Sequence, residues 1–212
     1  YYCLFVFLTD TATTEISTLS LHDALPIFDR LVALGVHEIQ VGILKRLRGA
    51  RIVRHDDAWG MVYSPLPPYE LIESNTVDFP TLQRLRRFAR YWDMIGNSGN
   101  FVETKLLLWA DGGDSPFGSF LRLSDWLFAQ TGRPYAIALP RLAELVFVYL
   151  TRVLGCDSSV AAASVRRDYR RPGRAGDLPL SQADVDREPP APRATRLRRS
   201  DRRQARHRAA DS

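Results

Sequence analysis

The sequence predicts a mixed α/β chain that is mostly α: one helix and one strand, then a bundle of four or five helices, then a disordered tail. Three observations predict this class. Apolar residues alternate along one clear stretch, at 37–44. Between 78 and 169 they recur at spacings of three and four, the period of an amphipathic helix. After Pro172 they become sparse, while Pro and Arg accumulate.

The first predicted elements are the end of an amphipathic helix at 28–34, which Gly35 stops, and a strand at 37–44. The apolar face of this strand has three members: Ile39, Val41 and Ile43. A helix followed at once by a strand is half of a βαβ unit, so we expect the last strand of a parallel barrel or sheet. Without neighbouring strands its apolar face lacks a sheet to join, which predicts that residues 28–212 aggregate when expressed alone.

A connecting region separates this strand from the helical bundle. Residues 45–49 form a basic loop, and 51–59 are predicted to form a short helix. The Pro-rich stretch 64–68 is predicted to be extended and stiff. Two interpretations of 69–74 stay open, a short strand or an ordered strap.

The bundle begins at Asp78, whose side chain is suited to capping a helix N-terminus. The apolar stripe of this helix comprises Phe79, Leu82, Leu85, Phe88, Trp92 and Ile95. Four arginines lie off the stripe and are predicted to form a solvated face: Arg84, Arg86, Arg87 and Arg90. The remaining predicted elements are a turn at 96–100, a buried helix at 101–109, and helices at 115–132, 139–154 and 158–169. Ser115 followed by Pro116 marks one helix start, and Asp157 is suited to cap the last helix.

The charge of the chain is unevenly distributed. Residues 1–155 carry 15 Lys and Arg against 16 Asp and Glu, whereas residues 156–212 carry 14 Arg against 8 acidic residues. The tail has no interleaved aromatic residues, so we interpret its Arg content as the mark of a GC-rich bacterial genome and expect no nucleic-acid partner. Two cysteines exclude a disulfide framework and a cysteine metal site, and no apolar stretch spans a bilayer. We therefore expect a cytoplasmic protein without a membrane partner.

Familiar catalytic motifs are absent from the sequence. It contains no Gly-rich phosphate loop, HExxH, GxSxG, CxxC or EF-hand loop. The acidic stretches 55–57 and 111–114 are interpreted as an exposed helix face and a turn. If the strand at 37–44 closes a barrel, Glu38 and Gln40 face inward and Lys45 lies on the rim of the active-site face. Two interpretations of Gln40 stay open: a cofactor contact, or a hydrogen bond within the barrel.

Residues 10–27 read DTATTEISTLSLHDALPI and have no clear helical or strand period. This string resembles the translation of a universal sequencing-library adapter in one reading frame, with Ser17 in place of Tyr. We therefore interpret residues 1–27 as an artefactual leader and give His22 and Asp23 no functional weight.

Residues 28–49, FDRLVALGVHEIQVGILKRLRG, resemble the end of the catalytic barrel in cobalamin-binding radical SAM proteins. There a helix precedes a strand reading roughly Q-x-G-x-L-K, then a basic loop and a glycine. The matching residues are Gln40, Gly42, Leu44, Lys45 and Gly49. Residues that look like marks of the family's C-terminal domain of unknown function are Tyr63, Ser64, Pro68, Tyr69, Glu70, Tyr91, Asn97, Ser98, Gly99 and Phe101. The resemblance extends to about Tyr169.

The resemblance implies that the chain is a fragment in four parts. These are the leader 1–27, the end of a radical SAM-type barrel at 28–60, a helical C-terminal domain at 61–170, and a disordered Arg- and Pro-rich tail at 171–212. It implies a parent enzyme with an N-terminal cobalamin-binding domain and a barrel whose CxxxCxxC holds a four-iron four-sulfur cluster and S-adenosylmethionine. The implied reaction is group or methyl transfer to an unknown substrate.

The cysteine triplet is missing from this chain, so we expect no cofactor within it, no catalytic residue and no metal ligand. Its expected partners are the missing domains of the parent. The resemblance places Gln40 and Lys45 near the cofactors, whereas Tyr69 and Asn97 either line the same mouth or hold the helical domain in place.

Two other functions stay open from the sequence. One is a stand-alone helical interaction module whose basic tail binds nucleic acid or an acidic partner. The other is a purely structural domain that covers the parent's active site or forms its dimer surface.

Overall fold

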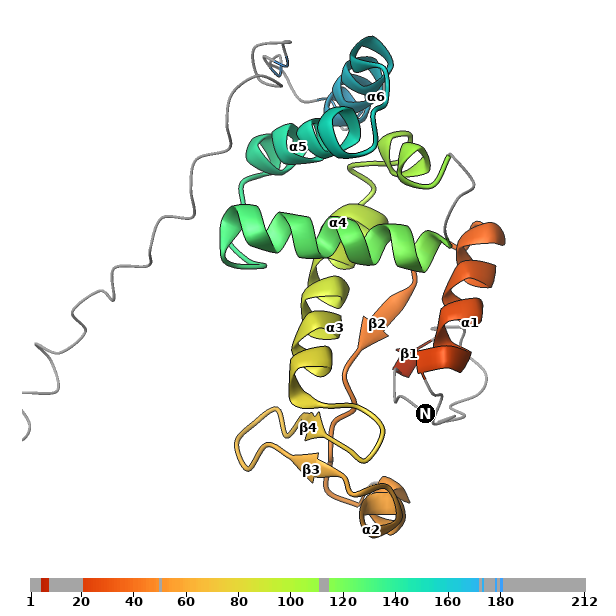
Figure 1. Ribbon diagram of the computed structural model, residues 1–212, viewed down its shortest axis with the longest axis vertical. Helices are drawn as coiled ribbons and strands as arrows, with labels where there is room; N and C mark the ends of the chain where they lie inside the picture. The colour runs from red at the N-terminus through yellow and green to blue at the C-terminus, as the bar shows by residue number, and fades with distance from the viewer. Residues whose placement is uncertain are drawn as a thin grey trace, which may run out of the picture.

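The protein is a mostly helical chain with a small α/β part, as the sequence predicts (Figure 1). The computed structural model describes residues 5–7, 21–49, 51–110, 115–171, 173, 178 and 180. The α-helices are α1 (Leu21–Ala33), α2 (Asp56–Trp59), α3 (Phe79–Trp92), α4 (Pro116–Thr131), α5 (Leu139–Val148) and α6 (Ser158–Arg170). Shorter turns are 3₁₀-helical in η1 (Arg51–His55) and η3 (Thr104–Leu108) and π-helical in η2 (Asp93–Asn97) and η4 (Tyr149–Val153). The strands are β1 (Phe5–Phe7), β2 (Gln40–Gly42), β3 (Val62–Tyr63) and β4 (Leu71–Glu73).

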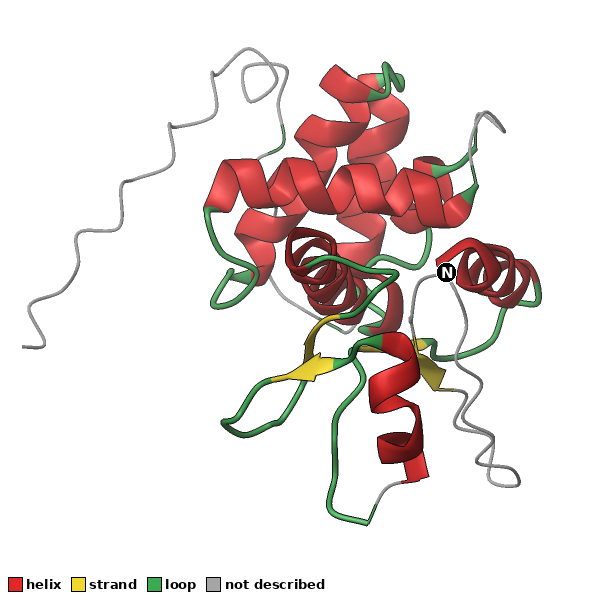
Figure 2. Cartoon of the chain, turned by 60° about the horizontal axis from the view of Figure 1, so that its bottom comes forward, coloured by secondary structure: helices red, strands yellow, loops and turns green. Residues whose placement is uncertain are grey.

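The strands form two small antiparallel pairs, β1 with β2 and β3 with β4. Figure 2 shows the short strands on one side of the helices, with the η1–α2 segment projecting below them. The parallel barrel neighbours expected for β2 stay a prediction, because among the described residues β2 pairs antiparallel with β1. An open strand edge presents unpaired N–H and C=O groups, and here β1 supplies the partner.

Helix α1 spans Leu21–Ala33, so residues 28–33 form its end, as the sequence predicts. Residues 21–27, whose sequence shows no clear period, are helical as well. Helix formation is cooperative, because a turn that is already docked adds each further residue at little cost. The adapter resemblance itself is a statement about sequence, and residues 8–20 lie outside the described part of the chain.

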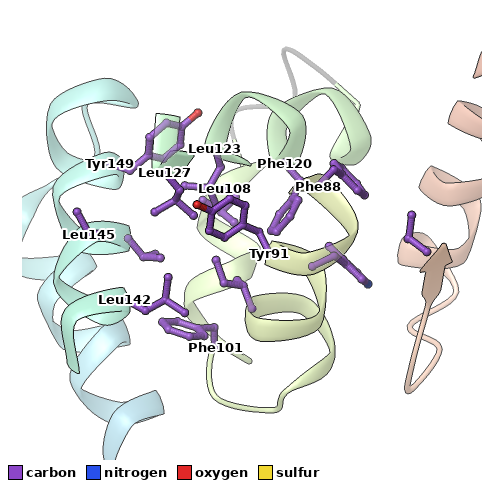
Figure 3. Close-up of a cluster of buried hydrophobic side chains, with 14 of the residues drawn as sticks. Phe88, Tyr91, Phe101, Leu108, Phe120, Leu123, Leu127, Leu142, Leu145 and Tyr149 are labelled. Carbon is purple, nitrogen blue, oxygen red and sulfur yellow. The ribbon is translucent and has the colours of Figure 1, made fainter. Parts of the chain in front are cut away.

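The helical core contains α3, α4, α5 and α6. Figure 3 shows buried side chains of α3, α4 and α5 gathered in one cluster, and α6 packs on α5 and η3. All members of the predicted stripe of α3 are buried except Phe79, the first residue of the helix, which is exposed. The predicted caps are confirmed: Asp78 Oδ1 accepts from the Thr81 N–H at 3.0 Å, and Ser115 Oγ accepts from the Gly118 N–H at 3.0 Å.

Asp157 caps α6 in the same way, through contacts with the first turn of the helix. Its Oδ1 accepts from the backbone N–H groups of Ser159 at 2.8 Å and Val160 at 3.0 Å. The Ser159 side chain first, and then these two N–H groups, lower the pKa of Asp157 from its ordinary value of 3.8. The charged carboxylate is therefore the form that the folded chain favours.

The predicted helix at 101–109 is only partly confirmed, since η3 is a short 3₁₀ turn. The carboxylate of Asp168 on α6 is fully buried and accepts from the backbone N–H groups of Glu103 at 2.9 Å and Thr104 at 2.8 Å. The Asp168 carboxylate thus accepts the hydrogen bonds of N–H groups at the start of η3, where a helix has no partners of its own for them. Arg171 Nη2 lies 3.2 Å from the same carboxylate and completes this buried site.

Arg84, Arg86 and Arg90 of α3 are exposed, as predicted for a solvated face, and Arg87 is half-buried. Three of these side chains also contact neighbouring elements. Arg84 Nη2 forms an ion pair with Asp125 of α4, and Arg86 forms one with Glu70 beside β4. The Arg87 guanidinium lies 4.4 Å from the centre of the Phe128 ring. Three of the four guanidinium groups therefore connect α3 to its neighbours.

The segment 28–44 is packed into this helical core. Phe28 is fully buried, and its ring meets those of Phe88, Trp92 and Phe117 edge-on at 5.4, 4.7 and 5.6 Å. Asp29 Oδ1 accepts from the Phe117 N–H at 2.8 Å, in the first turn of α4. The apolar face of β2 is buried as well: Ile39 is 3%, Val41 9% and Ile43 7% exposed.

This burial overturns the expectation that the apolar face of the strand is left without cover. Helix α3 packs against β2 and replaces the missing sheet. No helix in the described residues is long and apolar enough to cross a membrane. The predicted tail at 171–212 and the turn at 111–114 lie almost entirely outside the described residues.

Candidate functional site

A polar, open pocket of about 510 Å³ lies between β2 and the π-helical turn η2. Its lining residues are Glu38, Gln40, Val41, Asp93, Asn97 and Ser98. One wall comes from the strand and the other from the C-terminal end of α3, where the helix widens into η2. Turns of π-helix inside longer helices occur frequently at functional sites, so we take this β2–η2 pocket as the candidate site.

Asn97 joins the two walls by mimicking a strand partner. Its Oδ1 accepts from the backbone N–H of Ile39 at 3.1 Å, and its Nδ2 donates to the backbone C=O of Ile39 at 3.1 Å. The same Nδ2 donates to Asp93 Oδ1 at 3.2 Å. Both ends of the amide are therefore engaged, which makes Asn97 a positioning residue for the pocket.

The other polar side chains of the pocket make only local contacts. Gln40 Nε2 donates to Glu38 Oε1 at 3.2 Å across one face of the strand. The Ser98 hydroxyl donates to the Met94 C=O at 2.7 Å. One oxygen each of Glu38, Gln40 and Asp93 and one N–H of Gln40 Nε2 have no hydrogen bond with a described residue, so the pocket offers both acceptors and a donor to a ligand.

The η2 wall is held from behind by tight packing and one buried amine. A Cβ placed on Gly96 meets the indole ring of Trp92 at 2.5 Å, so only glycine fits between the turn and this buried ring. Lys105 Nζ donates to the Gly96 C=O at 3.2 Å. Burial lowers the pKa of Lys105 from 10.5, although the negative charge of Asp168 opposes this shift.

The structure brings together two of the four predicted site residues. Gln40 and Asn97 line the same pocket, whereas Lys45 lies five residues further along the chain, about 16 Å away if the strand is extended. Lys45 and Glu70 form a backbone bridge, and the Arg46 N–H donates to the Tyr69 C=O at 2.9 Å. The Lys45–Tyr69 pair therefore marks the far end of the strand and not the pocket.

Tyr69 has an unusual backbone conformation, with φ at 58° and its side chain 43% exposed. A bulky residue in the left-handed region costs of order 1–3 kcal/mol, and such residues cluster at functional positions. The Lys45 ammonium is exposed and forms no ion pair with a described residue. This end of the strand is a second, smaller candidate surface.

Two functional candidates were missed from the sequence, Asp93 and Lys105. Asp93 sits one turn from Asn97, yet nothing in the helical pattern distinguishes it from other exposed carboxylates. Lys105 had a signal, because it is one of two lysines in the chain and interrupts the apolar run 101–109. Its partner, the Gly96 carbonyl, becomes identifiable only when η2 is placed.

Metal binding has no support in the described residues, where no three His, Cys, Asp or Glu side chains gather. The pocket contains two carboxylates, and hard cations such as Ca²⁺ take six to eight oxygen ligands.

The fold and the pocket define a mostly helical domain, with the preceding helix α1 and strand β2 packed against one face of it. The sequence of residues 57–204 matches the model of a family described as "Protein of unknown function (DUF4080)". The match covers more than half of the chain, which therefore belongs to this family. No curated protein and no solved structure gives a significant match.

The boundary of the family match divides the pocket. Asp93, Asn97 and Ser98 lie inside the matched region, whereas Glu38, Gln40 and Val41 precede it. The candidate site is therefore a composite of the family domain and the segment before it.

Proposed function

We propose that this chain is the C-terminal part of a cobalamin-dependent radical SAM enzyme of unknown substrate, and that the helical domain supplies one wall of that enzyme's ligand cavity. The observation that carries the proposal is the composite pocket, in which the Gln40 strand and the η2 turn meet. The sequence resemblance of 28–49 to the end of a radical SAM barrel gives the strand its proposed origin. The DUF4080 match gives the helical domain a family without an assigned activity.

The packing of residues 28–44 against the helical domain favours a role of this domain as a cavity wall over a role as a separate dimerisation module. Phe28 enters the aromatic centre of the domain, Asp29 caps α4, and Asn97 holds Ile39 from both backbone groups. These contacts fix the strand relative to the domain without help from another chain. A domain held this firmly beside the strand is placed to line a cavity on that strand.

The iron–sulfur cluster of the proposed parent does not fit the residues of this chain. A radical SAM cluster needs three thiolates, and the sequence has two cysteines, Cys3 and Cys156. We therefore assign the cluster, S-adenosylmethionine and cobalamin to upstream domains and derive no catalytic step here. Lys45, with its exposed ammonium, and Gln40 are the residues that we place toward those cofactors.

The proposal is tested at the source locus, by long-read sequencing across the codon for Phe28. We expect the reading frame to continue upstream into CxxxCxxC and a cobalamin-binding domain. A start codon close to Phe28, or genomic codons that encode residues 10–27 as printed, would contradict the proposal. Such a result would favour the stand-alone interaction module instead.

A biochemical arm follows from the same proposal. The full-length parent, reconstituted with iron and sulfide, should show cluster absorbance and a reduced-cluster electron paramagnetic resonance signal. The present chain, treated in parallel, should retain no stoichiometric iron after desalting. We also propose a cytoplasmic location, where thiolates stay reduced.

A further inference from the structure

Two leucines beyond the last helix belong to the hydrophobic core. Leu178 is 3% and Leu180 4% exposed, and both are members of the cluster of buried residues that α3, α4, α5 and α6 share. They follow Arg170, the last residue of α6, and fall within the stretch 171–212 that the sequence predicts to be a disordered tail. That prediction is therefore wrong at these two positions.

Arg166 of α6 holds both leucines through their backbone. Its Nη2 donates to the Leu180 C=O at 2.6 Å, and its Nε lies 3.5 Å from the Leu178 C=O, a longer and weaker contact. The Leu180 N–H donates to the Leu178 C=O at 2.8 Å, the i to i+2 hydrogen bond of a γ-turn. Because both acceptors of Arg166 are backbone carbonyls, this contact depends on the path of the chain rather than on a side-chain charge.

Helix α6 has two neighbouring faces with different contacts. Figure 1 shows α6 beside α5, and its face toward η3 carries Asp168, which accepts from the Thr104 N–H. Spacings of three and four residues put two further buried side chains on that face: Ala161 and Val165. The same spacings put Ala162 and Tyr169 on the face of Arg166. The contacts of Arg166 therefore place Leu178 and Leu180 beside this second face.

The family match extends over the same part of the chain. It covers residues 57–204, so it continues past α6 and includes both leucines, whereas the sequence predicts that the helical domain ends at 170. Burial, the two contacts of Arg166 and the extent of the match agree that the folded domain reaches at least Leu180.

We infer that the face of α6 around Arg166 is a binding site for a short leucine-containing peptide segment, and that its occupant is this chain's own segment with Leu178 and Leu180. Arg166 binds the backbone carbonyls of the occupant, and the two leucine side chains provide its apolar contacts. A peptide of the same sequence, supplied separately, therefore competes for the site. The inference does not rest on the proposed radical chemistry, since its tests use this chain alone and the sequencing test leaves it unchanged.

Amide hydrogen exchange of the full chain tests whether the segment is docked. The Leu180 amide should exchange at least about tenfold more slowly in the chain than in a free peptide of residues 174–184, RAGDLPLSQAD. Arg166→Ala should remove most of this protection. Arg90→Ala is the matched control, because it removes the same side chain from an exposed position on α3, and it should leave the rate unchanged. Equal exchange rates in the wild-type chain and the free peptide would overturn the inference.

Binding of the separate peptide distinguishes a peptide site from a segment that is only ordered. A full chain that carries both Leu178→Ala and Leu180→Ala should bind the dye-labelled peptide saturably in a fluorescence anisotropy titration. The wild-type chain, whose site is occupied, should bind it at least about tenfold more weakly. The same peptide with both leucines replaced by Ala should not bind.

Two results of this titration would overturn the inference. One is the absence of peptide binding by the double variant while its helical circular dichroism equals that of the wild type. The other is equal binding of the leucine and alanine peptides. If the double variant loses its helical signal, Leu180→Ala alone takes its place, and the exchange rate of the wild-type chain still decides whether the segment is docked.

Discussion

Replacing Phe28 with Ala tests whether the segment before the family match belongs to the folded domain. The ring is fully buried and makes three edge-on aromatic contacts, with centres 4.7 to 5.6 Å apart. Truncation of a buried Phe to Ala costs about 3–5 kcal/mol, which is a large part of the roughly 5–15 kcal/mol that stabilises a typical domain. With a urea m-value of about 2 kcal/mol per molar, the unfolding midpoint should fall by roughly 2 M.

The assay is urea unfolding followed by the circular dichroism of the helices, which lie mostly outside α1. The matched control is Leu34→Ala, at the end of the same segment, where the side chain is 68% exposed and the expected change is within about 0.5 kcal/mol. Equal midpoints for Phe28→Ala and Leu34→Ala would refute the reasoning. In that case α1 would not be docked on the aromatic centre, and the composite pocket would lose its support.

Three further predictions use the same unfolding measurement. Gly96→Ala should destabilise the chain by about 1–3 kcal/mol, because the new Cβ meets the buried Trp92 ring. Gly118→Ala in α4 should instead stabilise it by about 0.5–1 kcal/mol. A gain in stability from both substitutions would contradict the tight fit of Gly96 in η2. Because the folded state lowers the pKa of Asp157, the unfolded chain binds more protons in acid, so the free energy of unfolding should fall as the pH drops below 3.8. Asp157→Asn should flatten this dependence of stability on pH. An unchanged dependence would contradict the capping role of Asp157. Asp168→Asn should cost about 1–3 kcal/mol, because the amide keeps one acceptor oxygen to serve the N–H groups of Glu103 and Thr104 and the guanidinium of Arg171, and an unchanged midpoint would count against its role as the anchor of η3.

The candidate site was only partly predictable. Gln40 stood out because it lies on the polar face of an alternating strand that resembles the end of a radical SAM barrel, and Asn97 because it belongs to a recognisable string of residues. Their meeting in one pocket depends on a helix that ends in a π-turn rather than at Trp92. Local periodicity does not distinguish an α-turn from a π-turn, since both continue the same apolar stripe.

The sequence by itself determined the helical class, the caps and the ends of most helices. Helix starts were predictable at Asp78, Ser115 and Asp157, because a short polar side chain accepts hydrogen bonds from the backbone N–H groups of the first helical turn. This interaction is local in the sequence. The alternation around β2 likewise identified its buried face, because side chains alternate along any strand.

Only the tertiary structure decided what each of these elements meets. It placed α3 against the apolar face of β2, turned the α3 arginines into contacts between elements, and anchored η3 on the buried carboxylate of Asp168. It also separated Lys45 from Gln40 and placed Gln40 in the same pocket as Asn97, 57 positions further along the chain. Such contacts depend on which surfaces remain unburied after the local elements form, and this is a property of the whole chain rather than of any window within it.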